Sequence, residues 1–162
     1  IERYESVLNS PFYLAELLPF SQYYIIYEDL AYAYEQMGNI DQSLYYWQQA
    51  LELRPDQMHI YFNIGLIYIS LNDLESALYS LHKAHELDTA DPDILMNMGI
   101  CYIELGQFAE GIDSLERRVA LGADADAYIA LGQAYGLAGR IGEQKVYYLR
   151  ALELAPNHAQ TE

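Results

Sequence analysis

The sequence predicts an all-α solenoid, a row of helical hairpins stacked side by side, and two observations support it. Similar residues recur at a fixed period: Tyr34, Tyr68, Tyr102 and Tyr135 are separated by 34, 34 and 33 residues. Apolar residues within each repeat follow helical spacing, as in the segment 61–71, and never alternate as in a strand. One such unit cannot bury its own apolar faces, so neighbouring copies must stack.

Each repeat is predicted to fold as two helices joined by a tight turn. The four units span residues 24–57, 58–91, 92–124 and 125–158. The first helices are expected at 22–37, 58–71, 92–105 and 125–138, and the second at 40–53, 73–87, 108–121 and 142–154. The residues that follow the first helices are Gly38, Asn72, Gly106 and Gly139. Glycine and asparagine tolerate the left-handed backbone that ends a helix, which supports these boundaries.

Three glycines occupy the same place in the middle of successive first helices. Gly65, Gly99 and Gly132 are 34 and 33 residues apart, and Ala31 takes this place in the first unit. Glycine inside a helix costs about 1 kcal/mol relative to alanine. Its recurrence therefore predicts that the two helices of a unit approach closely at this point.

The chain of 162 residues is strongly acidic, with 24 Asp and Glu against 8 Lys and Arg and a formal net charge of −16. Such a charge repels phosphate backbones and anionic headgroups, which argues against nucleic-acid binding. A basic or apolar partner is favoured, although acids on outer faces also serve solubility. No run of about 18 apolar residues occurs, so no membrane span is expected.

Cys101 is the single cysteine, so no internal disulfide can form. This favours a soluble protein of a reducing compartment such as the cytoplasm, while many exported proteins also lack disulfides. The chain begins at Ile1 rather than methionine, from which we expect a processed or excised piece of a longer chain.

The repeated unit resembles the tetratricopeptide repeat, or TPR. The first unit carries the family pattern at Tyr27, Leu30, Ala31, Tyr34, Ser43, Trp47, Ala50 and Pro55. Thr89 replaces the proline in the second unit, and Gln144 takes a usually small position in the fourth. The third unit departs at Arg118, where alanine is expected, and its exit loop near Gly122 is one residue short. The resemblance implies a right-handed superhelix of about four hairpins that binds other proteins.

The ends of the chain lie outside the repeat pattern. Residues 1–20 are interpreted as an N-terminal extension that forms a degenerate cap or folds back over the groove. The repeat domain is expected at 21–158, followed by a tail at 159–162. Many TPR domains end in an extra capping helix that this sequence lacks. Either the last helix is polar enough to face water, or the native chain continues.

In TPR domains the first helices line a concave groove, and the resemblance places a set of partner-binding residues there. The predicted residues are Tyr32, Phe62, Asn63, Leu66, Ile69, Met96, Asn97, Ile100, Ile103 and Ile129. Phe62, Leu66 and Ile69 are spaced i, i+4 and i+7, so they share one helix face. The helix at 58–71 is apolar on nearly every side, which exceeds what packing inside the solenoid uses.

The sequence therefore predicts a non-catalytic protein-interaction module, a scaffold, adaptor or assembly factor, that binds an apolar or amphipathic segment in its groove. Alternatively, residues 1–20 or a second copy in a homodimer cover the groove permanently. Two further alternatives are a secretion-type chaperone for a hydrophobic substrate segment and the helper region of a larger enzyme. Some TPR domains clamp a carboxylate with Lys and Arg; here Glu28, Asp93 and Met96 stand instead, so a carboxylate would be repelled.

No catalytic residue, metal site or cofactor is predicted. His82 and His85 are three residues apart, but Glu86 is the one further ligand in view, and metal sites need three or four. Cys101 lies in a column that packs inside the solenoid, so a buried thiol is expected rather than a nucleophile. Arg118 is expected either to extend into solvent or to pair with a neighbouring acid.

Overall fold

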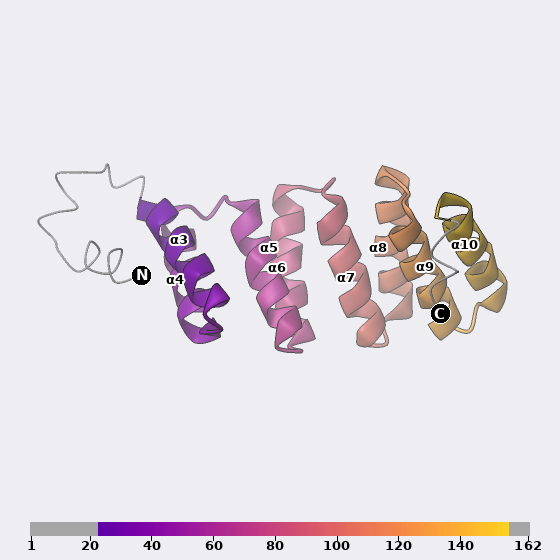
Figure 1. Cartoon of the computed structure of the whole chain (residues 1–162), viewed down its shortest axis with the longest axis horizontal. Helices are drawn as coiled ribbons and strands as arrows, with labels where there is room; N and C mark the ends of the chain where they lie inside the picture. Colours follow the sequence, from indigo (N-terminus) through magenta and orange to yellow (C-terminus); the bar gives the residue numbers. More distant parts are fainter. Residues whose placement is uncertain (1–22, 156–162) are drawn as a thin grey trace, which may run out of the picture.

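The computed structural model describes residues 23–155, and this part of the chain is a row of paired α-helices. The helices are α3 (Tyr23–Gln36), α4 (Ile40–Leu53), α5 (Met58–Ser70), α6 (Leu74–Leu87), α7 (Pro92–Glu104), α8 (Phe108–Leu121), α9 (Ala125–Leu137) and α10 (Ile141–Leu154). The pairs α3–α4, α5–α6, α7–α8 and α9–α10 stand side by side from one end to the other (Figure 1). The predicted all-α solenoid is confirmed. The expected N-terminal extension at 1–20 and tail at 159–162 lie outside the described residues.

The helix boundaries agree with the predicted ranges to within one residue. The turn residues have the expected positive φ: +73° at Gly38, +58° at Asn72, and +75° at Gly106 and Gly139. The first helices end one residue earlier than predicted because the next residue already belongs to the turn. Asp73 precedes its helix rather than starting it, because its carboxylate caps the helix by accepting the Ser76 N–H at 3.1 Å.

The glycines inside the first helices lie where the two helices of a hairpin cross. A Cβ placed on Gly99 would lie 2.6 Å from Cγ of Leu115, and one on Gly132 would lie 2.6 Å from Cδ1 of Tyr148. Real Cβ atoms do not approach other atoms so closely, so a side chain would force the helices apart. The predicted close approach is confirmed.

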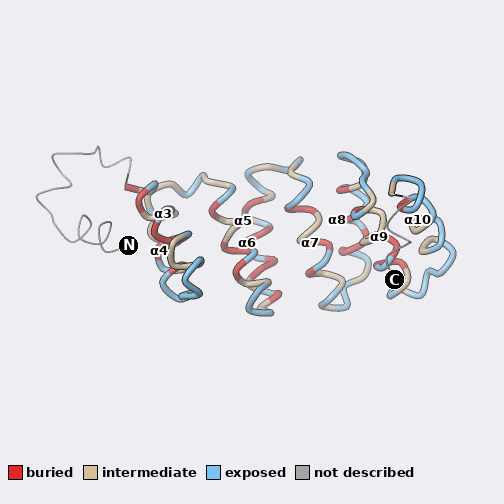
Figure 2. Tube along the Cα trace, in the orientation of Figure 1, coloured by how far each residue is buried: buried red, intermediate tan, exposed pale blue. Residues whose placement is uncertain are grey.

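The apolar core runs along the row as three clusters, and buried positions recur among exposed ones along α3–α9, whereas α10 is mostly exposed (Figure 2). Fully buried side chains include Leu30 and Trp47 in the first cluster, Leu81 and Ile94 in the second, and Leu115 and Leu131 in the third, where exposure is at most 1%. Each cluster combines residues of a second helix with residues of the next first helix. Stacking of neighbouring hairpins therefore supplies the core.

The exposed surface of α10 mixes apolar and charged side chains. Val146, Leu149 and Leu152 are spaced three residues apart and are 47%, 50% and 45% exposed. Lys145, Arg150 and Glu153 are exposed on the same helix. Within residues 23–155, each helix is too short or too polar to cross a lipid bilayer.

Candidate protein-binding face

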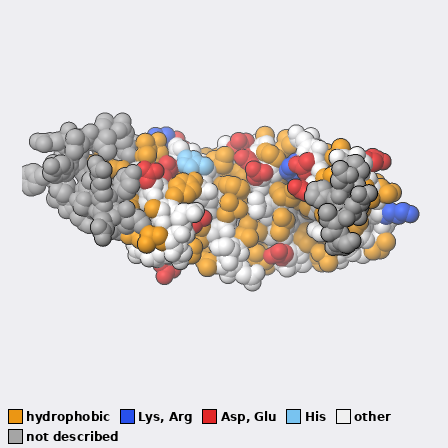
Figure 3. All heavy atoms as spheres, viewed as in Figure 1, with side chains coloured by type: hydrophobic (Ala, Val, Ile, Leu, Met, Phe, Trp, Pro, Cys, Tyr) orange, Lys and Arg blue, Asp and Glu red, His pale blue; other side chains and the backbone are white. Residues whose placement is uncertain are grey.

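A row of exposed apolar side chains crosses three of the first helices. Tyr32, Leu66 and Ile100 occupy the same place in α3, α5 and α7 and are 44%, 37% and 38% exposed. We call these three residues the apolar ladder. Gln133 is exposed at the corresponding place in α9. On the face seen in Figure 3, hydrophobic side chains gather across the middle of the row, with acidic side chains scattered around them.

Three of the predicted residues flank the ladder one helical turn earlier. Phe62, Met96 and Ile129 lie four residues before the ladder position in their helices and are partly buried. Phe62 packs against the second core cluster and Met96 against the third. Their inner atoms are held by the core, so the outer atoms present a fixed apolar surface beside the ladder.

Two other predicted residues turn toward the second helices. Ile69 packs against the second core cluster and Ile103 against the third. A Cβ on Gly111 of α8 would lie 2.7 Å from Cδ1 of Ile103, so this isoleucine fills the space that the glycine leaves. The predicted stripe therefore divides, because Leu66 and Ile100 face outward while Ile69 and Ile103 also hold the hairpins together.

The two predicted asparagines make hydrogen bonds within the chain. Asn63 Nδ2 donates to the Tyr32 hydroxyl at 2.6 Å and links α5 to α3. The Tyr32 ring also meets the Trp47 ring nearly edge-on, with centroids 4.6 Å apart. Asn97 Nδ2 donates to the Asp93 carbonyl at 2.8 Å. The asparagines bond these groups rather than each other, and Asn63 fixes the first member of the ladder.

The charge around the ladder is of one sign. The first helices α3, α5, α7 and α9 carry six carboxylates and no lysine or arginine. Glu28 of α3 lies 2.7 Å from Nε2 of His59 in α5, a second polar link between these helices. This face would repel a carboxylate and attract a basic flank beside an apolar segment.

His82 and His85 contact different partners. His82 Nε2 lies 2.6 Å from the Tyr102 hydroxyl, and His85 Nε2 lies 2.8 Å from Nη2 of Arg117. Burial and the Arg117 charge lower the pKa of His85, so the neutral ring can accept the guanidinium N–H. Among residues 23–155, no group of three His, Cys, Asp or Glu side chains is placed to hold a metal ion.

Cys101 is fully buried in the second core cluster. Burial raises the pKa of its thiol to about 11, so the group stays protonated at neutral pH. A thiolate nucleophile needs a depressed pKa and access to solvent. The interpretation of Cys101 as a buried thiol is confirmed.

Arg118 is buried, with 8% exposure, at the place that alanine takes in the other units. Its guanidinium donates to the Gly122 carbonyl and to the Asp124 carboxylate. Asp124 in turn caps α9 by accepting the Ala127 N–H at 2.7 Å. Pairing with an acid is therefore confirmed, and extension into solvent is wrong. The loop between α8 and α9 is one residue shorter than the corresponding loops, which places Asp124 close to Arg118. This short loop is the sequence feature that could have indicated the pair.

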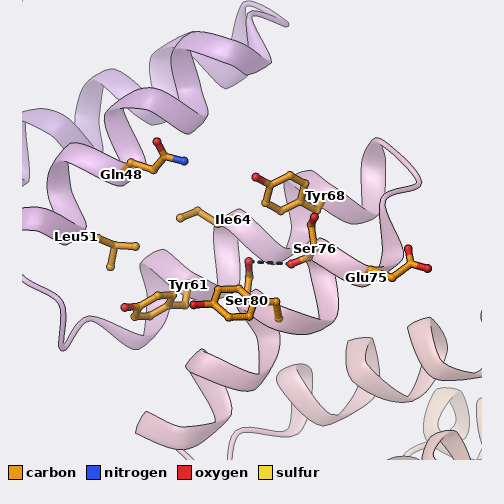
Figure 4. A pocket seen from close by; sticks show the side chains of 9 residues that line it. Gln48, Leu51, Tyr61, Ile64, Tyr68, Glu75, Ser76 and Ser80 are labelled. Atoms are coloured by element: carbon orange, nitrogen blue, oxygen red, sulfur yellow. Dashed lines mark hydrogen bonds between the residues drawn. The ribbon is translucent and has the colours of Figure 1, made fainter.

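A pocket that the sequence reasoning missed lies on another side of α5. It has a volume of about 510 Å³ and is bounded by α4, α5 and α6 (Figure 4). Gln48 and Leu51 line it from α4, Tyr61 and Tyr68 from α5, and Glu75 from α6. A smaller pocket of about 340 Å³ occupies the same place one repeat later. Tyr61 and Tyr68 occupy positions that the repeat pattern assigns to packing between helices. That pattern therefore gives no indication that they also line a cavity.

Three family models match the chain and together span residues 31–158. Two of them, described as tetratricopeptide repeat, match residues 68–134 and 125–158, and one described as TPR repeat matches residues 31–69. No curated protein sequence matches the chain significantly.

Solved structures of a protein called MamA share this fold. A crystal structure of MamA superposes with a TM-score of 0.82 at 21% identity and covers 98% of this chain and 88% of its own. MamA AMB-1 gives a TM-score of 0.76 at 22% identity, with 96% and 85% covered. MamA from Desulfovibrio magneticus RS-1 gives 0.76 at 17% identity, with 86% and 78% covered. At such identities the likeness establishes the fold alone.

Proposed function

Because the chain belongs to the tetratricopeptide repeat family and is a protein-interaction module, we propose that it binds an apolar or amphipathic segment of a partner along its first helices. The apolar ladder provides the central contact, and Phe62 and Met96 widen it. The partner segment lies across α3, α5 and α7. This proposal assigns no chemistry to the chain, which would act as a scaffold, adaptor or assembly factor.

The observation that carries the proposal is the exposure of the ladder. Tyr32, Leu66 and Ile100 are 37–44% exposed, while Phe62 and Met96 beside them are partly buried against the core. They recur at one place in consecutive helices, so they line up across the row instead of being scattered. Contiguous exposed apolar residues with a polar surround are typical of interaction sites. An amphipathic helix laid along such a row would bury one apolar residue per hairpin.

The charge of the first helices favours a partner segment with basic residues beside its apolar ones. Six carboxylates and no lysine or arginine lie on these helices. Complementary charges at the edge of an interface raise the association rate and disfavour wrong partners. Binding through this face should therefore weaken as ionic strength rises.

A displayed library of helical peptides tests the proposal. Peptides selected on the 162-residue chain should be amphipathic, and the double variant Leu66→Asp, Ile100→Asp should weaken their binding by at least about tenfold. Both side chains are exposed, so the variant should keep the circular dichroism of the parent. Leu152→Asp, which places the same charge on an exposed leucine of α10, is the matched control and should bind normally.

Two results would contradict the proposal. One is a library that yields no binder even to a chain lacking residues 1–20. The other is a set of binders that the double variant and Leu152→Asp affect equally. A gain in affinity after removal of residues 1–20 would instead indicate that this segment competes for the ladder.

A further inference from the structure

The pocket between α4, α5 and α6 combines apolar walls with two polar groups whose hydrogen-bonding capacity is unused among residues 23–155. The amide of Gln48 and the hydroxyl of Tyr68 lie on its walls, and neither makes a hydrogen bond to another residue in the described part of the chain. Leu51 and the rings of Tyr61 and Tyr68 supply apolar walls (Figure 4). Tyr61 and Tyr68 lie on a different side of α5 from Leu66, so the pocket is separate from the ladder.

In later repeats a hydrogen bond bridges the two side chains that correspond to Gln48 and Tyr68. Gln48 corresponds to His82 and Tyr68 to Tyr102, and there Nε2 of His82 lies 2.6 Å from the tyrosine hydroxyl. One repeat further, the Tyr135 hydroxyl donates to Glu116. Those two junctions therefore have a polar latch between a second helix and the next first helix. The first junction carries the tyrosine, but glutamine does not reach it.

In the later repeats an arginine of the chain itself lies near the corresponding tyrosine. Arg117 lines the smaller pocket together with Tyr102, and its guanidinium bonds His85. The guanidinium of Arg140 lies 4.5 Å from the ring centroid of Tyr135. Among residues 23–155 the first pocket has no such group, because Lys83 occupies the position of Arg117 and its Nζ lies 2.7 Å from Glu86.

The charge of the three surrounding helices suits a cation. α4, α5 and α6 carry four carboxylates and one lysine, which is paired, and within residues 23–155 no lysine or arginine lines the pocket. Glu75 lies at the rim of the pocket, with its exposed side chain extending away from Gln48 (Figure 4). A guanidinium combines a flat face that stacks on tyrosine with five N–H donors for a carboxylate, an amide oxygen and hydroxyls. Lysine offers three donors on a compact, strongly hydrated head and cannot stack in this way.

We propose that this pocket binds an arginine side chain of a partner protein, in the place where later repeats use an arginine of their own. The guanidinium stacks on the tyrosine rings and pairs with Glu75. Its N–H groups donate hydrogen bonds to the Gln48 amide oxygen and the Tyr68 hydroxyl. This site lies apart from the apolar ladder, and it gives the second-helix side of the solenoid its own contact with a partner.

The test is a titration of the ¹⁵N-labelled 162-residue chain, followed by NMR. The probes are the capped tripeptides Gly-Arg-Gly, Gly-citrulline-Gly and Gly-Lys-Gly, added up to on the order of 10 mM, because a single side chain binds weakly. Citrulline has the shape of arginine without its charge. The arginine peptide should shift the side-chain amide of Gln48 and the backbone amides of Ser76 and Ser80 in a saturable way, and the other two peptides should not.

Three variants locate the effect. Glu75→Gln should weaken binding by about fivefold, the upper range for a solvent-exposed ion pair. Gln48→His introduces the residue of the next repeat, should form the latch with Tyr68 and should abolish the shifts. Glu110→Gln makes the same charge change beside the smaller pocket and should bind like the parent.

Several outcomes would overturn the proposal. They are the absence of saturable shifts with the arginine peptide, equal shifts with the citrulline or lysine peptide, and shifts that persist in Gln48→His. The Leu66→Asp, Ile100→Asp variant should bind the arginine peptide normally. Failure of this site and failure of the ladder can therefore be told apart.

Discussion

The N-terminal half of the row, α3–α6, and the C-terminal half, α7–α10, are fastened on different sides. In the N-terminal half, Asn63 and His59 reach back from α5 to α3, so the polar links join first helices. In the C-terminal half, Tyr135 bonds Glu116 and Arg118 bonds Asp124, so the links join α8 to the N-cap and the last turn of α9. The same repeat can thus be cross-linked on either face, and the larger pocket opens at the first junction, where Gln48 and Tyr68 form no such link among residues 23–155.

The hairpins of the two halves also differ in tightness. A Cβ on Gly65, in the N-terminal half, would lie 3.0 Å from Leu81. The corresponding distances at Gly99 and Gly132 in the C-terminal half are both 2.6 Å. A difference of a few tenths of an ångström decides whether a methyl group can be accommodated. The C-terminal half should therefore tolerate substitution less well.

The largest effect is expected at Arg118. Arg118→Ala restores the residue of the other units but leaves the Gly122 carbonyl and Asp124 without their donor in a loop that is one residue short. The free energy of unfolding should fall by about 2 kcal/mol, because the hydrogen bonds of the buried guanidinium and the packing of its aliphatic stem are lost while Asp124 stays half-exposed to water. Urea unfolding followed by circular dichroism measures it.

Two further variants control that experiment. Arg140→Ala removes an exposed arginine and should lower the free energy of unfolding much less than Arg118→Ala. Insertion of one residue after Gly122 in the Arg118→Ala chain restores the 34-residue period and should recover part of the loss. Equal stability of Arg118→Ala and Arg140→Ala would show that the arginine does not hold this junction.

A smaller difference is expected between two glycines. Gly99→Ala gains about 1 kcal/mol of helix propensity but pushes a methyl group into Leu115, so a net loss of about 1–2 kcal/mol should result. Gly65→Ala, with 3.0 Å to Leu81, should change stability by less than about 0.5 kcal/mol. Paired thermal and urea denaturation measures both. Equal losses would contradict the difference in tightness between the halves.

The latch is tested by removing one oxygen from each tyrosine. Tyr135→Phe deletes the donor to Glu116 and should lower the free energy of unfolding by about 1 kcal/mol. Tyr68→Phe should be nearly neutral, because the Tyr68 hydroxyl has no hydrogen bond to the described residues. A cost for Tyr68→Phe as large as that for Tyr135→Phe would argue that the first junction is latched as well.

The smallest effect concerns acid stability. The Ala127 N–H, and then Arg118, lower the pKa of Asp124 below its ordinary value of 3.8. A depressed pKa in the folded state gives stability that is present above the ordinary value and is lost as pH falls through the lower one. Asp124→Asn should therefore lose less stability than the parent below about pH 4. The difference should stay under about 1 kcal/mol, because the carboxylate is 52% exposed. Parallel stability curves against pH would contradict this.

The repeat pattern predicted the ladder because position in a repeat largely decides which way a side chain faces. Leu66 and Ile100 are exposed as expected, since they lie one phase away from the packing residues. The pattern does not separate them from Ile69 and Ile103, which lie one turn further along the same stripe. Those two turn inward because the facing helix has a small residue, such as Gly111, that leaves room for them.

The pocket and the buried arginine could not be read from the repeat in the same way. Each depends on whether a particular polar side chain reaches a group from another helix, as Arg118 reaches Asp124 and Gln48 fails to reach Tyr68. Reach depends on loop length, rotamer and the angle between hairpins. None of these properties repeats with the 34-residue period. A residue that departs from the repeat pattern therefore shows where an unusual contact can form, but it does not show which contact forms.

The helices, their turns and the hairpin crossings could be predicted from the amino-acid sequence, because glycine, asparagine and helical apolar spacing act within one unit. Stacking of the hairpins sets which residues of the predicted stripe turn inward, which junction is latched and where a cavity remains. Backbone preferences act over a few residues, whereas a hydrogen bond between helices forms only when stacking brings donor and acceptor to about 3 Å.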